Sequence, residues 1–318
     1  MVKAVLLDAE SLGSNLDFSA LNASVDDCLY FQTTAPDEVS ERIADADIVI
    51  SNKVRLDAIH LTAAKRLKLV CVAATGTNNI DQKAAAERGI AVSNCQNYGS
   101  ESVAQHTLTL MLMLATQAHH YQRDVRTGVW SNQPQFCLLH RPIVTLAGKI
   151  LLIVGHGHIG QRVAVLARAF GMHVQIAQLP WRPEQAGRVP FEQALMQADV
   201  VSLHCPQTAD TEYLINADRL ARMKPGSWLI NVARGGLVDE AALLYALNNG
   251  PLAAAALDVL SVEPPSSSHP LLAATLDNLI VTPHIAWAAQ SARQTLIDQV
   301  AENILAFRRG QPLRRVDA

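Results

Sequence analysis

An arginine, a glutamate and a histidine in the last third of the chain form a set that could do chemistry. Arg234, Glu263 and His284 each end or follow an apolar run typical of a buried strand, and all three come after the glycine-rich run 155–160. A guanidinium can clamp a carboxylate, an imidazole can give a proton, and a neighbouring carboxylate can favour the protonated imidazole. Together these groups indicate the reduction of a 2-keto acid.

The glycine-rich run indicates where a hydride would come from. It reads Gly155-His156-Gly157-His158-Ile159-Gly160, follows the apolar strand 150–154 and opens a helix predicted over 161–170. In this context the first glycine permits a tight turn, the second lets the backbone approach a pyrophosphate, and the third lets the helix pack on the strand. We therefore predict a dinucleotide contact through Gly155, Gly157, His158, Ile159 and Gly160. A strand–helix turn without a ligand is the alternative.

The acidic residue expected about 20 residues further on is missing. Residues 161–183 contain no Asp or Glu, and Gln178 ends the next predicted strand. Without a carboxylate, nothing there repels a 2′-phosphate, and Arg182 could pair with one. Alternatively, Gln178 bonds the ribose and Arg182 is solvated. The sequence therefore leaves both NAD and NADP open as the cofactor.

Short apolar runs alternate with helical patterns along the chain, which is typical of a parallel α/β protein. A long, largely apolar helix is predicted over 102–120, a short one over 81–87, and a last one over 288–309. The predicted strands are 4–7, 47–50, 69–72, 150–154, 173–177, 200–204, 228–232, 254–257 and 279–281. The predicted fold class is therefore α/β, with two Rossmann-like domains that each contain a doubly wound parallel sheet.

The last predicted helix is long enough to leave the second domain and pack back on the first. This predicts a discontinuous, flavodoxin-like substrate-binding domain of residues 1–98 plus 289–318, and a dinucleotide-binding Rossmann domain of residues 99–288. Periodicity fades over 121–148, where Trp130 and Phe136 stand among polar residues and prolines. That segment is either a flexible linker or an arm that grips a partner subunit.

Composition excludes several classes of protein. The 318 residues have room for two domains, and 49% hydrophobic against 17% charged residues can build large cores. A net charge of −3 argues against a nucleic-acid partner. Five scattered cysteines without a CxxC pair favour a reducing compartment. With neither a signal peptide nor an apolar stretch of bilayer length in the sequence, we expect a cytoplasmic protein without a membrane partner. No spacing of ligand residues indicates a metal.

The motifs around the three candidate catalytic residues, in their order after the glycine run, resemble the D-isomer-specific 2-hydroxyacid dehydrogenase family. Within it, the similarity is greatest to the glycerate dehydrogenase (hydroxypyruvate reductase) branch. The resemblance spans nearly the whole chain. It is carried by Ala74–Asp81, Tyr98–Gly99, Ser102–Thr107, Ser202–Pro206, Asn231–Asp239, Ala256–Pro265 and Thr282–Trp287.

The resemblance implies a role for each residue and an active site in the cleft between the domains. Arg234 would bind the substrate carboxylate and keto oxygen, His284 would be the general acid/base, and Glu263 would tune His284. Further cofactor contacts would come from Cys205, Pro206, Thr211, Val232, Ala233, Asp258 and Ala286. Substrate contacts would come from Thr75 and Gly76 in the first domain. Asn52 and Lys53 follow a predicted strand and are either cleft or surface-loop residues, and Trp287 either walls the pocket or packs between domains.

The implied reaction is reduction of hydroxypyruvate, or of glyoxylate, to D-glycerate or glycolate with NADH or NADPH. Another 2-hydroxy acid is an alternative substrate. A second class of function is an NAD(H)-sensing, corepressor-like binding protein of the same fold. The resemblance also implies a homodimer. The other histidines, His106 among them, are interpreted as structural or solvated.

Overall fold

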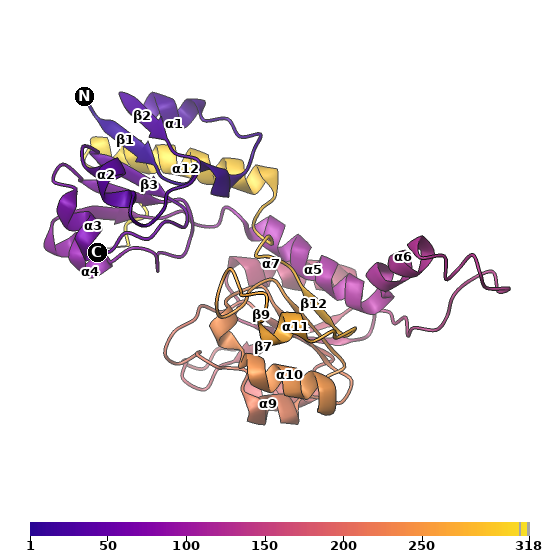
Figure 1. Ribbon diagram of the computed structural model, residues 1–318. Coiled ribbons are helices and arrows are strands. Elements are labelled where there is room, and N and C mark those ends of the chain that lie inside the picture. The colour runs from indigo at the N-terminus through magenta and orange to yellow at the C-terminus, as the bar shows by residue number, and fades with distance from the viewer. Residues whose placement is uncertain (312, 317–318) are drawn as a thin grey trace. The chain divides into compact units, whose positions relative to one another are not determined.

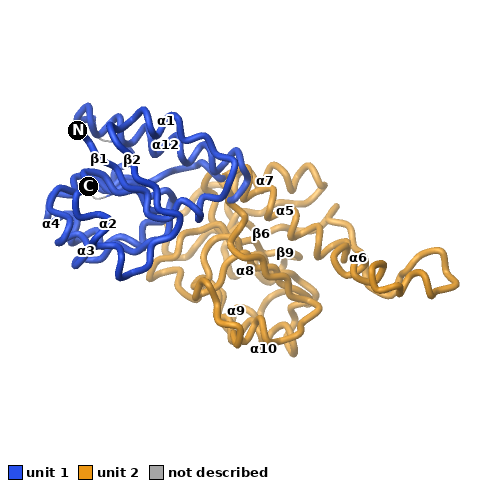
Figure 2. Tube along the Cα trace, turned by 45° about the horizontal axis from the view of Figure 1, so that its top comes forward, with its two compact units in different colours: residues 1–99, 288–318 blue, residues 100–287 orange. Residues whose placement is uncertain are grey.

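The computed structural model describes residues 1–311 and 313–316, and the chain divides into two compact units (Figure 2). Unit 1 comprises residues 1–99 and 288–318, and unit 2 comprises residues 100–287. Each unit is built on a parallel sheet flanked by helices, so the predicted α/β class is confirmed. In the described part of the chain, no helix is both long and apolar enough to cross a membrane.

Unit 1 contains a five-stranded parallel sheet in the order β2-β1-β3-β4-β5, which is the flavodoxin-like order. Three of its strands, β3, β4 and β5, are buried at every residue, and the continuous apolar runs of β3 and β4 predict this. The strands are β1 (Lys3–Leu6), β2 (Asp27–Tyr30), β3 (Ile48–Ser51), β4 (Leu69–Val72) and β5 (Ala91–Ser93). The helices are η1 (Ala9–Leu12), α1 (Ser19–Ser24), α2 (Val39–Ile43), α3 (Ala58–Ala63), α4 (Gln82–Glu87) and α12 (Gln290–Arg308).

Unit 2 contains a seven-stranded sheet in the order β12-β11-β10-β9-β6-β7-β8. The chain fills one side of β6 first and then continues from β9 on the other side, so a topological switch point lies between β6 and β9. The strands are β6 (Ile150–Val154), β7 (His173–Gln178), β8 (Val189–Pro190), β9 (Val200–Leu203), β10 (Trp228–Asn231), β11 (Ala254–Leu257) and β12 (Leu279–Val281). The helices are α5 (Ser100–Thr116), α6 (Ala118–Arg126), α7 (His158–Ala169), α8 (Phe191–Gln197), α9 (Ala217–Arg222), η2 (Gly235–Leu237), α10 (Glu240–Asn249) and α11 (Pro270–Ala273).

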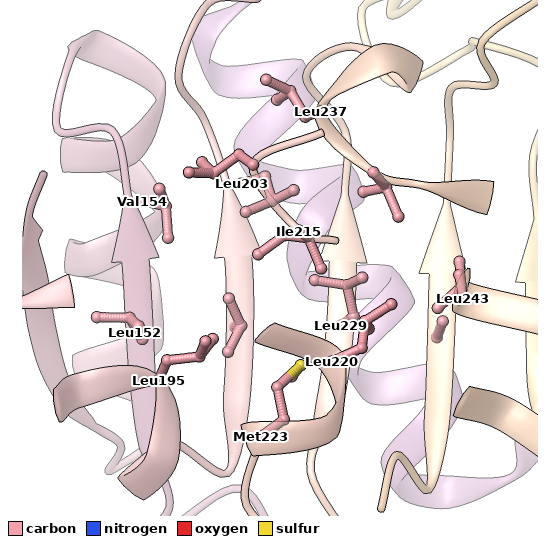
Figure 3. Close-up of a cluster of buried hydrophobic side chains, with 14 of the residues drawn as sticks. Leu152, Val154, Leu195, Leu203, Ile215, Leu220, Met223, Leu229, Leu237 and Leu243 are labelled. Atoms are coloured by element: carbon pink, nitrogen blue, oxygen red, sulfur yellow. The ribbon is translucent and has the colours of Figure 1, made fainter. Parts of the chain in front are cut away.

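Both faces of the unit 2 sheet are covered by apolar side chains. Alternate residues of β6 point to opposite faces, so Leu152 and Val154 join one buried cluster while Leu151 and Ile153 join the other. Figure 3 shows the first cluster, in which side chains from β6, β9 and β10 meet those of helices such as Leu195 of α8. The second cluster packs beneath α5 and α7. This double burial fixes the strand ends that carry the candidate site.

The prediction of one helix over 102–120 is wrong. Gln117 adopts a left-handed conformation with φ of 55°, which ends α5 at Thr116 and starts α6 at Ala118. Residues 121–126, which belong to the predicted linker or arm, are therefore helical. Beyond α6 the chain projects away from the sheet as a long loop (Figure 1).

Candidate active site

The three candidate catalytic residues follow three adjacent strands of unit 2. Arg234 follows β10, Glu263 follows β11 and His284 follows β12. The ladder continues past the strand ends, because the amide of Asp258 donates to the Asn231 carbonyl over 2.9 Å. Because the carboxyl ends of parallel strands share one edge of the sheet, the fold brings these residues to the same edge.

His284 and Glu263 form a directly bonded pair. The Nδ1 atom of His284 lies 2.6 Å from Oε2 of Glu263, and the two side chains are 29% and 34% exposed. The other oxygen of Glu263 accepts from the Leu260 amide over 2.9 Å, which fixes the carboxylate. With Nδ1 committed to Glu263, Nε2 is the ring nitrogen that can exchange a proton with a ligand.

The backbone of His284 is held in an uncommon conformation by Asp258. His284 has φ of 54°, and its amide donates to the Asp258 carbonyl over 2.8 Å. The Asp258 carboxylate accepts from the Ile285 amide over 3.0 Å and from the Ala286 amide over 2.8 Å. Its side chain has 0% exposure and holds this turn, and the cofactor contact predicted for Asp258 stays a prediction.

The turn that carries Arg234 is built by Asn231. The Asn231 side chain donates to the Arg234 carbonyl over 2.9 Å and accepts from the Ala233 amide over 3.0 Å. Gly235 then packs on backbone: a Cβ atom at this position would lie 2.0 Å from the carbonyl carbon of Leu260. Leu260 is the residue whose amide fixes Glu263, so a glycine is required for the arginine turn to contact the glutamate loop.

The glycine turn fits a dinucleotide. Gly155 has φ of +100°, and a Cβ there would lie 2.5 Å from the Cys205 nitrogen, so the turn sits against the end of β9 at the switch point. A Cβ on Gly160 would lie 2.1 Å from the Gly155 oxygen. Gly157 caps α7 without a side-chain bond, and no atom lies within 4 Å of the position of its Cβ. The helix N-terminus is thereby open to a phosphate.

The loop after β9 is held by Thr211. Its hydroxyl oxygen lies 2.7 Å from the Thr208 amide and 2.8 Å from the Pro206 carbonyl, and the residue is 4% exposed. Cys205 is also buried, at 5%. Four other predicted cofactor residues are half-buried or buried: Ile159, Val232, Ala233 and Ala286. The hydroxyl of Thr211 therefore holds the backbone of the predicted cofactor loop.

His204, beside the glycine turn, is a neutral histidine in the folded protein. Its Nε2 lies 2.8 Å from the Ser202 hydroxyl, and burial lowers its pKa from 6.5 to about 3. Between about pH 6.5 and 3 this histidine is therefore protonated in the unfolded chain and neutral in the folded protein. Its contribution to the free energy of unfolding is complete above pH 6.5 and is lost as the pH falls.

We expect His204→Gln to reduce the pH slope of the unfolding free energy by up to ~1.4 kcal/mol per pH unit. Urea titrations across this range measure it. His173→Gln, at an exposed histidine, is the control, and an unchanged slope in His204→Gln would contradict the prediction.

The end of β7 is organised by Gln178. Its Nε2 donates to the carbonyls of Leu179, Arg182 and Pro183 over 3.1, 2.9 and 3.1 Å, and its Oε1 accepts from the Gln185 amide over 3.2 Å. Gln178 therefore shapes the loop that carries Arg182. The alternative prediction, a bond from Gln178 to a ribose, competes with these contacts, while the Arg182 side chain is exposed.

The predicted substrate residues of unit 1 lie after its strands and are held by buried groups. The Asp8 carboxylate accepts from the amides of Asn52 and Lys53 over 2.9 and 2.6 Å. The Asn52 side chain is buried against the Ser11 hydroxyl at 3.1 Å, so it builds this loop rather than facing solvent.

Thr75, beside Gly76, donates to the Cys95 carbonyl over 2.9 Å. In unit 2, Trp287 donates to the His284 carbonyl over 3.0 Å.

No role at the site was predicted for Asp8, Asn231 or His106, although Asp8 and Asn231 hold its loops and Nε2 of His106 lies 3.0 Å from the Thr282 hydroxyl. Asp8 directly follows β1, and Asn231 ends β10, so their positions at strand ends were a usable signal. His106 lies inside a helix and gave no such signal. In the described residues, no group of three or more His, Cys, Asp or Glu side chains is arranged to hold a metal ion.

A histidine–glutamate pair and a glycine turn that fits a dinucleotide, both at the carboxyl edge of one Rossmann sheet, are the features of a nicotinamide-dependent dehydrogenase. A family model described as D-isomer specific 2-hydroxyacid dehydrogenase, NAD binding domain, matches residues 108–286. The chain is 43% identical to a glycerate dehydrogenase of Methylorubrum extorquens over 316 residues, 99% of each chain. It is 38% identical to a hydroxypyruvate reductase of Blautia hydrogenotrophica, covering 99% of this chain and 100% of the other.

A solved structure has the same fold as this chain. A protein from Thermus thermophilus superposes with a TM-score of 0.87 at 34% identity, covering 99% of this chain and 100% of the other. The chain therefore belongs to the D-isomer-specific 2-hydroxyacid dehydrogenase family. It is an NAD(P)-dependent oxidoreductase, as the motifs predicted.

Proposed function

We propose that the protein reduces hydroxypyruvate to D-glycerate, with glyoxylate as a second substrate. The observation that carries this proposal is the 2.6 Å bond between His284 and Glu263 at the sheet edge that also holds the Arg234 turn. The substrate assignment is supported by relatives named glycerate dehydrogenase and hydroxypyruvate reductase.

Each residue has one task in the proposed reduction. The cofactor, when bound, supplies the hydride to the keto carbon. Arg234 holds the substrate carboxylate and keto oxygen with its planar fork of donors. His284 gives the proton at Nε2 to the keto oxygen, and Glu263 stabilises the imidazolium at Nδ1. Gly155, Gly157 and Gly160, with the α7 N-terminus, would hold the pyrophosphate.

The direct test is hydroxypyruvate-dependent oxidation of NADH and of NADPH, measured side by side with glyoxylate as the comparison substrate. We expect turnover of both keto acids, faster with hydroxypyruvate, and a product of D configuration. An absence of turnover with any small 2-keto acid would favour the alternative of an NAD(H)-sensing, corepressor-like binding protein.

We propose that Arg182 lets the protein use NADP(H) as well as NAD(H). The loop around it is shaped by Gln178 through backbone carbonyls, so removing the Arg182 side chain leaves those contacts intact. We expect Arg182→Gln to weaken NADPH binding by roughly tenfold, about the strength of one charge-assisted bond, with NADH binding unchanged. Fluorescence titration of both cofactors measures this, with the exposed Arg309→Gln as control. Equal effects on the two cofactors would refute the assignment.

We propose that residues 127–148, the part of the predicted arm beyond α6, engage a second copy of the chain in a homodimer. Phe136 and Leu139 on this segment are 90% and 78% exposed, which is unusual for large apolar side chains. A cavity of about 420 Å³ at the amino ends of the unit 2 strands is lined by apolar residues such as Trp228, by charged residues such as Asp199, and by Arg141, Pro142 and Val144 of the same segment. Light scattering should give a dimer mass that Phe136→Asp reduces to the monomer. A wild-type monomer at assay concentration would exclude this arrangement.

A further inference from the structure

Helix α5 contacts the turn that carries the general acid through two polar side chains. Ser102 and His106 are four residues apart and therefore lie on one face of the helix. The Ser102 hydroxyl donates to the Ala286 carbonyl over 2.6 Å, and Nε2 of His106 lies 3.0 Å from the Thr282 hydroxyl. Both ends of the segment 282–286 are thus tied to the same helix.

The hydrogen-bond directions at Thr282 are determined by its neighbours. Its hydroxyl donates to Oδ1 of Asp258 over 2.6 Å, so the same oxygen accepts from Nε2–H of His106. Nε2 also lies 3.4 Å from Oδ1 of Asp258. His106, Thr282 and Asp258 therefore form a connected polar network whose members come from α5 and from the loops that follow β12 and β11.

The network keeps a buried carboxylate charged. Burial by itself would raise the pKa of Asp258, but the bonds from His106, Thr282 and the amides of Ala286 and Ile285 bring that pKa below its ordinary value. The ionised carboxylate is the acceptor that the two backbone amides require. Losing one donor weakens the hold on the turn, because buried polar networks are stable when every member is satisfied.

We propose that His106 is a positioning residue for His284, acting through Thr282 and Asp258. Its side chain is 17% exposed and that of Asp258 is 0% exposed, and their contacts run to the turn. The turn holds His284 at φ of 54°, a conformation that non-glycine residues adopt at a cost and keep when their surroundings fix it. The consequence for catalysis rests on the proposed function.

Two pairs of variants test this role. His106→Leu and Thr282→Val remove the polar contacts, whereas His106→Gln and Thr282→Ser keep a donor at Nε2 and the hydroxyl. We expect the apolar variants to lower kcat by roughly 10- to 100-fold, because a small misplacement of the proton donor is costly. KM and the cofactor Kd should change by less than about twofold, since the polar contacts of both residues run to the turn. The conservative variants should recover most of the turnover. Thr109→Val, at an exposed threonine of α5, is the matched control.

A second measurement does not depend on turnover. The Nδ1–H of His284, bonded to Glu263, should give a downfield proton signal in the NMR spectrum of the holoprotein, assigned by its loss in His284→Gln. We expect this signal to broaden or shift in both apolar variants and to persist in the conservative ones and in Thr109→Val. An unchanged signal in His106→Leu and Thr282→Val would overturn the positioning role. An unchanged kcat in those variants would do so too. Wild-type protein that shows the signal but reduces no keto acid would instead refute the proposed function.

Discussion

Replacing His284 with glutamine is expected to lower the turnover of 2-keto acid reduction by roughly 10²–10⁴-fold, the usual contribution of a positioned general acid. Glutamine keeps a nitrogen near the position of Nε2 but cannot give up a proton at neutral pH. The keto oxygen would then have to take its proton from water while hydride arrives at carbon. The loss should therefore appear in kcat, and the cofactor Kd should stay near the wild-type value.

Steady-state kinetics with hydroxypyruvate, together with fluorescence titration of the cofactor, measures both quantities. His173→Gln makes the same exchange at an exposed histidine that begins β7 and should leave kcat unchanged. Near-normal turnover in His284→Gln would remove His284 from the chemistry. The 2.6 Å bond to Glu263 would then be a structural contact.

The strands of the two sheets differ in how visible they are in the sequence. β4, β6, β11 and β12 have the predicted bounds, since strands buried on both faces read as continuous apolar runs. β2 was missed because its residues alternate between exposed and half-buried, and β8 because it has two residues. The break at Gln117 was also missed, because apolar periodicity continues across a single left-handed residue.

The residues of the candidate site also differ in how far the sequence predicts them. Arg234, Glu263 and His284 could be predicted because their types, order and strand-end positions specify a chemistry. The groups that hold them were not predicted. Asn231 acts on backbone atoms nearby, and His106 reaches a hydroxyl 176 residues away in sequence. The His106 contact depends on which segments become neighbours in the fold, and those neighbours cannot be read directly from a single sequence.

The second large effect is expected at Arg234. Arg234→Gln should lower kcat/KM for hydroxypyruvate by roughly 10²–10⁴-fold, because removing one partner of a desolvated charge pair costs about 2–5 kcal/mol. Arg234→Lys should recover only part of this, since an ammonium group cannot make the two parallel bonds of a guanidinium. The folded turn should survive both changes, because it is built by the Asn231 side chain and the Arg234 carbonyl.

A carboxylate-free ketone separates the two contacts assigned to Arg234. Hydroxyacetone keeps the keto oxygen of hydroxypyruvate and lacks its carboxylate, so the wild-type enzyme should strongly prefer the acid. If the guanidinium recognises the carboxylate, Arg234→Gln should lower kcat/KM far more for hydroxypyruvate than for hydroxyacetone, and the preference should shrink. Arg222→Gln, at an arginine of α9 paired with Asp218 and Glu192, is the control and should keep it. A preference that survives in Arg234→Gln would mean that other residues bind the carboxylate, leaving the keto oxygen as the contact of Arg234.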